Sequence, residues 1–252
     1  MKIIVTGSEG FIGQHLVKSL LKSDHEVTCW DITLNKDIKD FHSMTKLWSS
    51  SEYYPDFVIH LAALTNVRES VSQPDQYWTT NVEYSKIIFD ACRHIPMVYA
   101  SSSCASQWWK SPYGATKRAM EELAHDGHIG LRFTVVWGPG SPPHMLMSRL
   151  ADGKIKYKTN HIRDFLHVFD AVKAIELIMN IGTKHGLVNH MAIENKVYDV
   201  GTGKGVVVSE LVERYGIDVP LKEGESCEMY NNVANITEIE KLGWKPTMEF
   251  YR

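Results

Sequence analysis

The sequence is poor in cysteine and carries little excess charge. It has four widely spaced cysteines and no CxxC pair: Cys29, Cys92, Cys104 and Cys227. This argues against a disulfide scaffold or a zinc site and favours reduced thiols in a cytoplasmic protein, so we expect no metal. A net charge of −3 over 252 residues gives no basic field for nonspecific nucleic-acid binding. We therefore expect a small-molecule partner and no nucleic acid.

Long hydrophobic runs are also missing. No apolar run approaches the roughly 20 residues that a membrane-spanning helix needs. The first residues, MKIIVTG, are typical of a strand and lack the apolar core and cleavage site of a signal peptide. We expect a soluble protein with no membrane contact, long enough for one large domain or a main domain with a small lobe.

What the sequence does contain is an alternation of short apolar runs and longer helical patterns. The apolar runs, which predict buried strands, lie at 3–5, 26–30, 57–61, 97–100 and 131–137. The helical patterns lie at 11–22, 40–49, 74–92 and 112–125. Such alternation implies right-handed crossovers and a parallel sheet covered on both faces. The predicted fold is α/β, a Rossmann-type doubly wound parallel sheet.

The regular alternation weakens after the cluster GPGSPP at 138–143. A helix at 169–180 and a strand at 197–200 are expected to return to the main domain. The predicted main domain is 1–140 plus parts of 161–201. The predicted small lobe is 141–160 and 202–252.

A glycine-rich turn follows the first strand. Gly7, Gly10 and Gly13 stand where a strand runs into a helix, which allows a tight turn, close approach of backbone to a pyrophosphate and helix N–H donors. Asp31 ends the second strand, where an acid hydrogen-bonds the adenosine ribose and repels a 2′-phosphate. The pattern favours NAD over NADP. The alternative is an ordinary turn, with Asp31 opening a loop.

The stretch ASSSCASQWWKSPYGATK at 100–117 contains no His, Asp or Glu. Tyr113 and Lys117 lie one helical turn apart on one face. A free phenol, with a pKa of about 10, is a poor base at neutral pH, and a nearby ammonium and an oxidised nicotinamide would lower that pKa. Ser103 would then hydrogen-bond the reacting hydroxyl, with Ser101 or Ser102 as alternatives. The other interpretation places the Tyr113 ring in the core and Lys117 on a solvated helix face.

Motifs along the whole chain resemble one family. They are TGSEGFIG, IHLAA at 59–63, NV at 81–82, SSS at 101–103, YGATK at 113–117, LRFTVVWGPG at 131–140, RDFLHVFD at 163–170, YDVGTG at 198–203 and LGWKP at 242–246. In this order they resemble the extended short-chain dehydrogenase/reductases, particularly the NAD-dependent nucleotide-sugar epimerase/dehydratase group that includes UDP-glucose 4-epimerase. The resemblance implies a main domain that binds NAD and a small C-terminal lobe that binds substrate.

The resemblance also implies roles for individual residues. The glycines contact the cofactor diphosphate, Asp31 its adenosine ribose, and Ser103, Tyr113 and Lys117 are catalytic. The full set expected to contact NAD is Gly7, Gly10, Phe11, Ile12, Gly13, Asp31, Asp37, Ile38, Leu61, Ala62, Ala63, Asn81, Tyr113 and Lys117.

Substrate contacts are expected from the lobe and its borders. Arg163 matches a family arginine that contacts the nucleotide diphosphate; the alternative is an internal salt bridge with Asp164. Lys222 and Glu225 stand where relatives carry an arginine-glycine-acid pattern, so charge is kept but the guanidinium is lost. Val135 replaces a family asparagine, which removes one substrate hydrogen bond.

The residues after Ser103 decide between two reactions of the group. Family members that dehydrate sugars carry an Asp-Glu pair there, whereas this chain has Cys104 and Ala105. We therefore expect an NAD-dependent epimerase that oxidises a nucleotide sugar transiently to a keto-sugar. The alternatives are a nucleotide-sugar oxidoreductase, either a dehydrogenase or a reductase, and a non-catalytic NAD-binding regulatory protein. The helices at 74–92 and 112–125 resemble those that form the family's homodimer interface.

Overall fold

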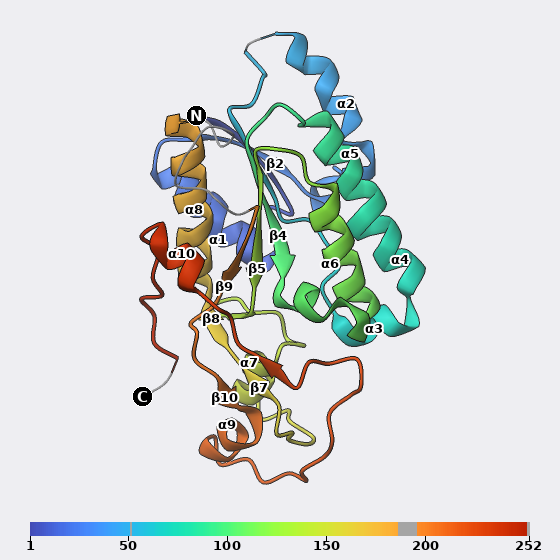
Figure 1. Ribbon diagram of the computed structural model, residues 1–252, viewed down its shortest axis with the longest axis vertical. Helices are drawn as coiled ribbons and strands as arrows, with labels where there is room; N and C mark the ends of the chain where they lie inside the picture. The colour runs from blue at the N-terminus through green and yellow to red at the C-terminus, as the bar shows by residue number, and fades with distance from the viewer. Residues whose placement is uncertain (51, 186–195, 251–252) are drawn as a thin grey trace.

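The computed structural model describes residues 1–50, 52–185 and 196–250, which build a six-stranded sheet flanked by helices (Figure 1). Every neighbouring pair of strands is parallel. From one edge to the other the strands are β2 (Glu26–Trp30), β1 (Lys2–Thr6), β3 (Phe57–His60), β4 (Met97–Ser102), β5 (His128–Phe133) and β9 (Val197–Val200). The strand order reverses between β1 and β3, where ligands bind in such sheets. The Rossmann-type doubly wound fold is confirmed.

Helices cover both faces of this sheet (Figure 1). One face carries α1 (Phe11–Lys22) packed on α8 (Val168–His185). The other face carries α2 (His42–Thr45), α4 (Pro74–Trp78), α5 (Tyr84–Ala91) and α6 (Pro112–Leu123), with α3 (Val67–Ser72) beside the start of α6. The sequence fixes the start of α6 locally, because the Ser111 hydroxyl accepts a hydrogen bond from the Gly114 amide and Pro112 occupies the first turn.

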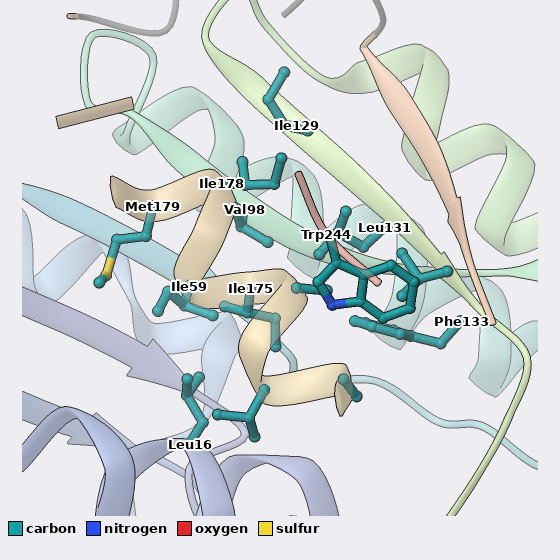
Figure 2. Packing of buried hydrophobic residues seen from close by; sticks show 14 of the residues in the cluster. Leu16, Ile59, Val98, Ile129, Leu131, Phe133, Ile175, Ile178, Met179 and Trp244 are labelled. Atoms are coloured by element: carbon teal, nitrogen blue, oxygen red, sulfur yellow. The ribbon is translucent and has the colours of Figure 1, made fainter. Parts of the chain in front are cut away.

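The main core lies between the sheet and the face formed by α1 and α8. Leu16 of α1, Ile59 of β3, Val98 of β4 and Ile175 of α8 are fully buried there (Figure 2). Trp244 packs into the same cluster, just after α10 (Thr237–Lys241). The segment that begins at 202 therefore does not lie wholly in the small lobe, because its part at 237–244 packs against the main sheet.

Two predicted elements are interrupted in the structure. The strand expected at 131–137 breaks at Thr134, because the Thr134 amide donates to Val200 whereas the Val135 amide donates to Asp164. β6 (Val135–Trp137) therefore leaves the main sheet and pairs with β8 (Phe165–His167). The helix expected at 74–92 contains a π-helical segment, Thr79–Glu83, between α4 and α5.

Short 3₁₀ turns replace other expected helix and loop segments. The helix predicted at 40–49 contains only α2, flanked by 3₁₀ turns at Ile38–Asp40 and Lys46–Ser49. Further 3₁₀ turns lie at Ile32–Leu34 after β2 and at Ser103–Lys110 after β4.

A small lobe lies at the end of the main sheet to which β4 points (Figure 1). Its three-stranded sheet has the order β10 (Val206–Val207), β7 (Ile162–Arg163) and β11 (Asn231–Asn232). The lobe also contains α7 (Leu146–Ala151) and α9 (Val208–Arg214), whose Leu150 and Leu211 share a separate hydrophobic cluster. Within the described ranges, no helix has both the length and the hydrophobicity to cross a membrane.

Candidate functional site

A cavity of about 740 Å³ lies between the carboxyl ends of the main strands and the small lobe. Its walls come from the glycine turn after β1, the ends of β3 and β4, the start of α6 and the lobe. This volume is in the range of pockets that bind cofactors and small molecules. The predicted residues that line it are Gly7, Gly10, Phe11, Ile12, Gly13, Leu61, Ala63, Ser103, Tyr113, Lys117, Val135 and Arg163.

The glycine turn is packed too closely for larger residues. Gly7 has a φ of +69°, and a Cβ placed on it would lie 2.7 Å from the Ala62 nitrogen. A Cβ on Gly13 would lie 2.1 Å from the Gly7 oxygen. Gly10 is the residue directly before α1, and it has no side chain that could cap the first amides of the helix. Bare backbone and a helix N-terminus at a cavity wall fit the diphosphate of a dinucleotide.

Asp31 lies beside the glycine turn and is buried. Its Oδ2 accepts from the Glu9 amide over 3.1 Å, and its Oδ1 accepts from the amide and hydroxyl of Thr33. The carboxylate therefore caps the 3₁₀ turn after β2 and ties it to the glycine turn. Asp31 is not part of the cavity wall itself, so its expected contact with a ribose stays a prediction.

Tyr113 and Lys117 lie side by side in the first turns of α6, and both are buried. The Tyr113 amide donates to the Ser70 hydroxyl, and its ring meets Tyr77 edge-on at 6.4 Å. The Lys117 Nζ donates to the Ala100 carbonyl of β4 over 2.8 Å. Lys117 is thus a cavity-wall residue and does not lie on a solvated helix face.

Burial shifts the pKa of each residue in the direction that favours its neutral form. It raises the pKa of the Tyr113 phenol above the ordinary range; Cys104 acts in the same direction, and a hydrogen bond with Ser102 opposes it. Burial also lowers the pKa of Lys117 to about 8, while the Glu121 carboxylate acts the other way. The pKa of Tyr113 is therefore raised in this structure, and the lowered pKa expected with both Lys117 and an oxidised nicotinamide beside the phenol stays a prediction. A further positive charge in the cavity would favour the phenolate.

The three consecutive serines after β4 make different contacts. Ser101 donates to Glu121, which also receives two hydrogen bonds from Arg132. Ser102 accepts from the Cys104 amide and is the serine that acts to lower the pKa of Tyr113. Ser103 is 9 % exposed and lines the cavity. All three serines line the cavity, but the Ser101 hydroxyl is already engaged with Glu121, which leaves Ser102 and Ser103 as the candidates to contact a ligand.

Arg163 reaches the cavity from the lobe. Its Nη1 donates to the carbonyls of Met229 and Ile162, over 2.7 and 3.0 Å, and its Nη2 lies 3.4 Å from Glu228 Oε2. Asp164 instead accepts from backbone amides, including those of Thr202 and Gly203. The alternative ion pair between Arg163 and Asp164 is therefore wrong.

Comparison with known protein families assigns the chain to a family whose cofactor suits this cavity. A sequence profile of the NAD dependent epimerase/dehydratase family matches residues 3–201. The chain belongs to this family. Its members are enzymes, and NAD is the cofactor of this epimerase/dehydratase.

Individual relatives extend over nearly the whole chain. A UDP-glucose 4-epimerase of Caenorhabditis elegans is 28% identical, over 97% of this chain and 93% of its own length. The solved structure of MoeE5 with UDP-glucose and NAD is 26% identical, covers 99% of this chain and 95% of its own, and has a TM-score of 0.81. The Thermotoga maritima UDP-glucose 4-epimerase, at 24% identity, a TM-score of 0.81, and coverage of 99% and 94%, shows the same fold.

Some residues expected to contact NAD do not line the cavity of this epimerase/dehydratase. Asn81, in the π-helical segment, is fully buried and hydrogen-bonds both the amide and the carbonyl of Leu64. It therefore shapes the loop that carries Ala63. Ala62 packs against the core, Ile38 is buried, and Asp37 pairs with Lys39 at 3.3 Å. Their expected contacts with NAD stay predictions.

The expected contacts from Lys222 and Glu225 also lie outside the cavity wall. Lys222 places its Nζ 5.3 Å from the ring centre of Tyr157, and Glu225 is exposed. The wall also contains polar residues that were not predicted as site residues, among them Arg68, Tyr157, His161 and Glu228. Only the charge of Arg68, soon after the IHLAA motif, offered a signal in the sequence. Among the described residues no cluster of His, Cys, Asp or Glu could hold a metal ion.

Proposed function

We propose that this member of the epimerase/dehydratase family is an epimerase. Its substrate would be a nucleotide sugar, oxidised transiently to a keto-sugar and reduced on the opposite face. The observation that carries the proposal is the single cavity in which Tyr113, Lys117 and Ser103 face the glycine turn, with Arg163 in the same wall. The residues needed for a proton transfer, a dinucleotide and an anionic substrate thus border one space.

The cofactor site would be formed by the turn and its neighbours. Gly7, Gly10 and Gly13 would hold the diphosphate against the start of α1, with Asp31 towards the adenosine ribose. Bound NAD supplies a reversible acceptor for the hydride of the sugar carbon and a positive charge on its nicotinamide.

Tyr113 would move the proton. Its phenol, held neutral by burial, gains acidity when a positive charge enters the cavity beside it, as does any acid near a cation. The phenolate would take the proton from the sugar hydroxyl, and Ser103 would hydrogen-bond the same oxygen. Lys117 would add a second positive charge, since a pKa of about 8 leaves it largely protonated at neutral pH. The same tyrosine would return the proton when the keto-sugar is reduced.

The wall of the cavity favours epimerisation over dehydration. Among its described residues the only carboxylate is Glu228, which faces Arg68 and Arg163. Cys104 stands where sugar dehydratases carry an acid, and burial raises the pKa of its thiol. A neutral thiol supports neither acid-assisted loss of a hydroxyl nor removal of a proton from carbon.

The relatives suggest where to look for the substrate. One relative is a UDP-glucose 4-epimerase and another binds UDP-glucose, which supports a uridine diphosphate sugar as the first compound to assay. We assign its recognition to the lobe at 141–160 and 161–163 and to the first part of 202–252. A homodimer through α4, α5 and α6, which lie side by side in Figure 1, also stays a prediction.

The test is turnover of a panel of nucleotide sugars, followed by separation of the epimers. Tyr113→Phe should lower turnover at least about a hundredfold, because it removes the acid–base group. Tyr84→Phe is the matched control and should keep full activity, because Tyr84 is a partly buried tyrosine on α5 that does not line the cavity.

Two results would count against the epimerase. Steady NADH formation without an epimer would identify an oxidoreductase. NAD binding without conversion of any nucleotide sugar would identify a protein that binds the cofactor without turnover.

A further inference from the structure

Two arginines from opposite walls of the cavity converge on one carboxylate. The Nε of Arg68, on α3, donates to Glu228 Oε1 over 2.7 Å. The Nη2 of Arg163, on β7, lies 3.4 Å from Glu228 Oε2, and the Nδ1 of His161 lies at the same distance from that oxygen. All four residues line the cavity. One acidic group thus sits among two guanidinium groups and an imidazole.

Each guanidinium is held in place by a second contact. Arg68 donates from Nη1 to the Tyr157 hydroxyl over 2.7 Å. Arg163 donates from Nη1 to the Met229 carbonyl, also over 2.7 Å. The two guanidinium groups therefore keep their orientation without depending on Glu228 alone. Both direct N–H donors to the part of the cavity that the Glu228 carboxylate occupies.

We propose that this point binds the diphosphate of the substrate, with Arg68 as its second arginine and the Glu228 carboxylate occupying the position until the anion enters. The proposal rests on the proposed function, because it concerns the substrate of the same cavity. A carboxylate and a phosphate both accept paired hydrogen bonds from guanidinium groups, so Glu228 marks a position suited to a phosphate.

The ion pair between Arg68 and Glu228 is weak enough to be exchanged. The Arg68 side chain is 44% exposed and that of Glu228 is 18% exposed, so water screens their attraction. A diphosphate carries more negative charge and more acceptor oxygens than one carboxylate. It would therefore displace Glu228 and gain charge-assisted hydrogen bonds from both arginines.

The same arrangement accounts for the lysine at position 222. The family pattern places an arginine there, but the Lys222 Nζ lies over the ring of Tyr157 and outside the cavity wall. Tyr157 in turn accepts from Arg68. Lys222 thus supports the residue that orients Arg68, and the second guanidinium fork comes from the main domain.

The experiment measures calorimetric binding of UDP to the NAD-saturated protein. Glu228→Gln should bind UDP about tenfold more tightly, because the internal competitor loses its charge. Arg68→Met should bind it about tenfold to a hundredfold more weakly, the range of one hydrogen bond to a charged group. Arg68→Lys, which keeps the charge but not the fork, should fall between Arg68→Met and the unmodified protein.

Matched controls come from the same molecule. Glu223→Gln makes the same charge change on the same loop at an exposed position and should leave UDP affinity unchanged. Arg118→Gln removes an arginine that pairs with Glu122 on the surface of α6 and should also leave it unchanged. Inorganic pyrophosphate, titrated in parallel, should follow the same order, which assigns the effect to the phosphates and not to the nucleoside.

The proposal is overturned by any of three results. Weaker UDP binding by Glu228→Gln would make Glu228 a ligand contact. Unchanged affinity in the Arg68 variants, with folding verified by circular dichroism, would place the anion elsewhere. No binding of UDP or pyrophosphate to the unmodified protein would remove the site. Because binding needs no turnover, an inactive protein that shows the expected order would refute the epimerase and leave the anion site intact.

Discussion

The two ends of the cavity are built in opposite ways. At the end proposed to bind NAD, one continuous segment supplies the glycine turn and the start of α1, and the backbone is packed so closely that a Cβ at Gly7 or Gly13 has no room. At the lobe end, Arg68, Tyr157 and Glu228 come from distant segments and meet through partly exposed charged and polar contacts. The first end depends on steric fit, and the second on a balance of charges.

This difference has consequences for tolerance to change. Close-packed backbone cannot shift to admit even one methyl group without loss of stability. Solvated ion pairs add little to the free energy of folding, so their residues are free to vary with the ligand. Substitutions in the glycine turn should therefore mainly lower the stability of the protein, whereas substitutions at the lobe end should mainly change ligand binding.

The largest expected effect on stability comes from Gly13→Ala. Its Cβ would lie 2.1 Å from the Gly7 oxygen, so the turn must open, and we expect a loss of about 3 kcal/mol in the free energy of unfolding. Urea denaturation measures the loss. Gly10→Ala is the graded control, because its nearest contact is 3.1 Å and its loss should be below about 1 kcal/mol. Equal losses in both variants would contradict the steric account.

Lys117→Met is expected to stabilise the protein, by less than Gly13→Ala destabilises it. The folded pKa of about 8 lies below the ordinary value of 10.5, so below pH 8 the fold contains a buried charge that the unfolded chain keeps in water. Removing it should raise the free energy of unfolding at pH 7 by about 1–2 kcal/mol, after loss of the hydrogen bond to Ala100. Turnover should fall, since the positive charge beside Tyr113 is lost.

The pH dependence tests the cause of that gain. Between about pH 8 and 10.5 the unfolded chain holds a proton that the folded protein has released, so the stability of the unmodified protein should rise with pH in this window. The advantage of Lys117→Met should therefore be complete below pH 8 and vanish towards pH 10.5. Urea denaturation of both proteins at several pH values measures the difference in their free energies of unfolding. A difference that stays constant from pH 8 to pH 10.5 would rule out the buried charge as its cause.

The smallest effect on stability should come from Arg68→Met. The ion pair with Glu228 is partly exposed, and Glu228 keeps Arg163 and His161 as neighbours, so the free energy of unfolding should change by less than about 1 kcal/mol. Thermal and urea denaturation measure this. A loss as large as that of Gly13→Ala would show that the lobe end is also held by rigid packing, and the contrast between the two ends would disappear.

The sequence predicted the fold well where local patterns are strong. The five strands placed in the first half all exist, and α1 has the predicted bounds of 11–22. The break at Thr134 was missed, because it depends on which neighbours, Val200 or Asp164, accept the backbone hydrogen bonds. The π-helical segment at 79–83 was missed for the same kind of reason, since buried Asn81 hydrogen-bonds the distant loop at Leu64.

The residues of the candidate site also fall into those that the sequence predicted and those that it did not. The cavity joins twelve predicted positions, among them Gly7, Ser103, Tyr113 and Arg163. Seven others, such as Asn81 and Lys222, lie outside its wall. Arg68 and Glu228 were not predicted, because they are separated by 160 positions and no spacing rule connects them.

The sequence by itself determined the strand–turn–helix that suits a dinucleotide, the family, and the one-turn spacing of Tyr113 and Lys117. These follow from local backbone geometry, which neighbouring residues set. The tertiary structure alone decided the protonation preferences of that pair and the convergence of Arg68 and Arg163 on Glu228. Desolvation and charge depend on what long-range packing brings close, and that information is not contained in any short segment of the chain.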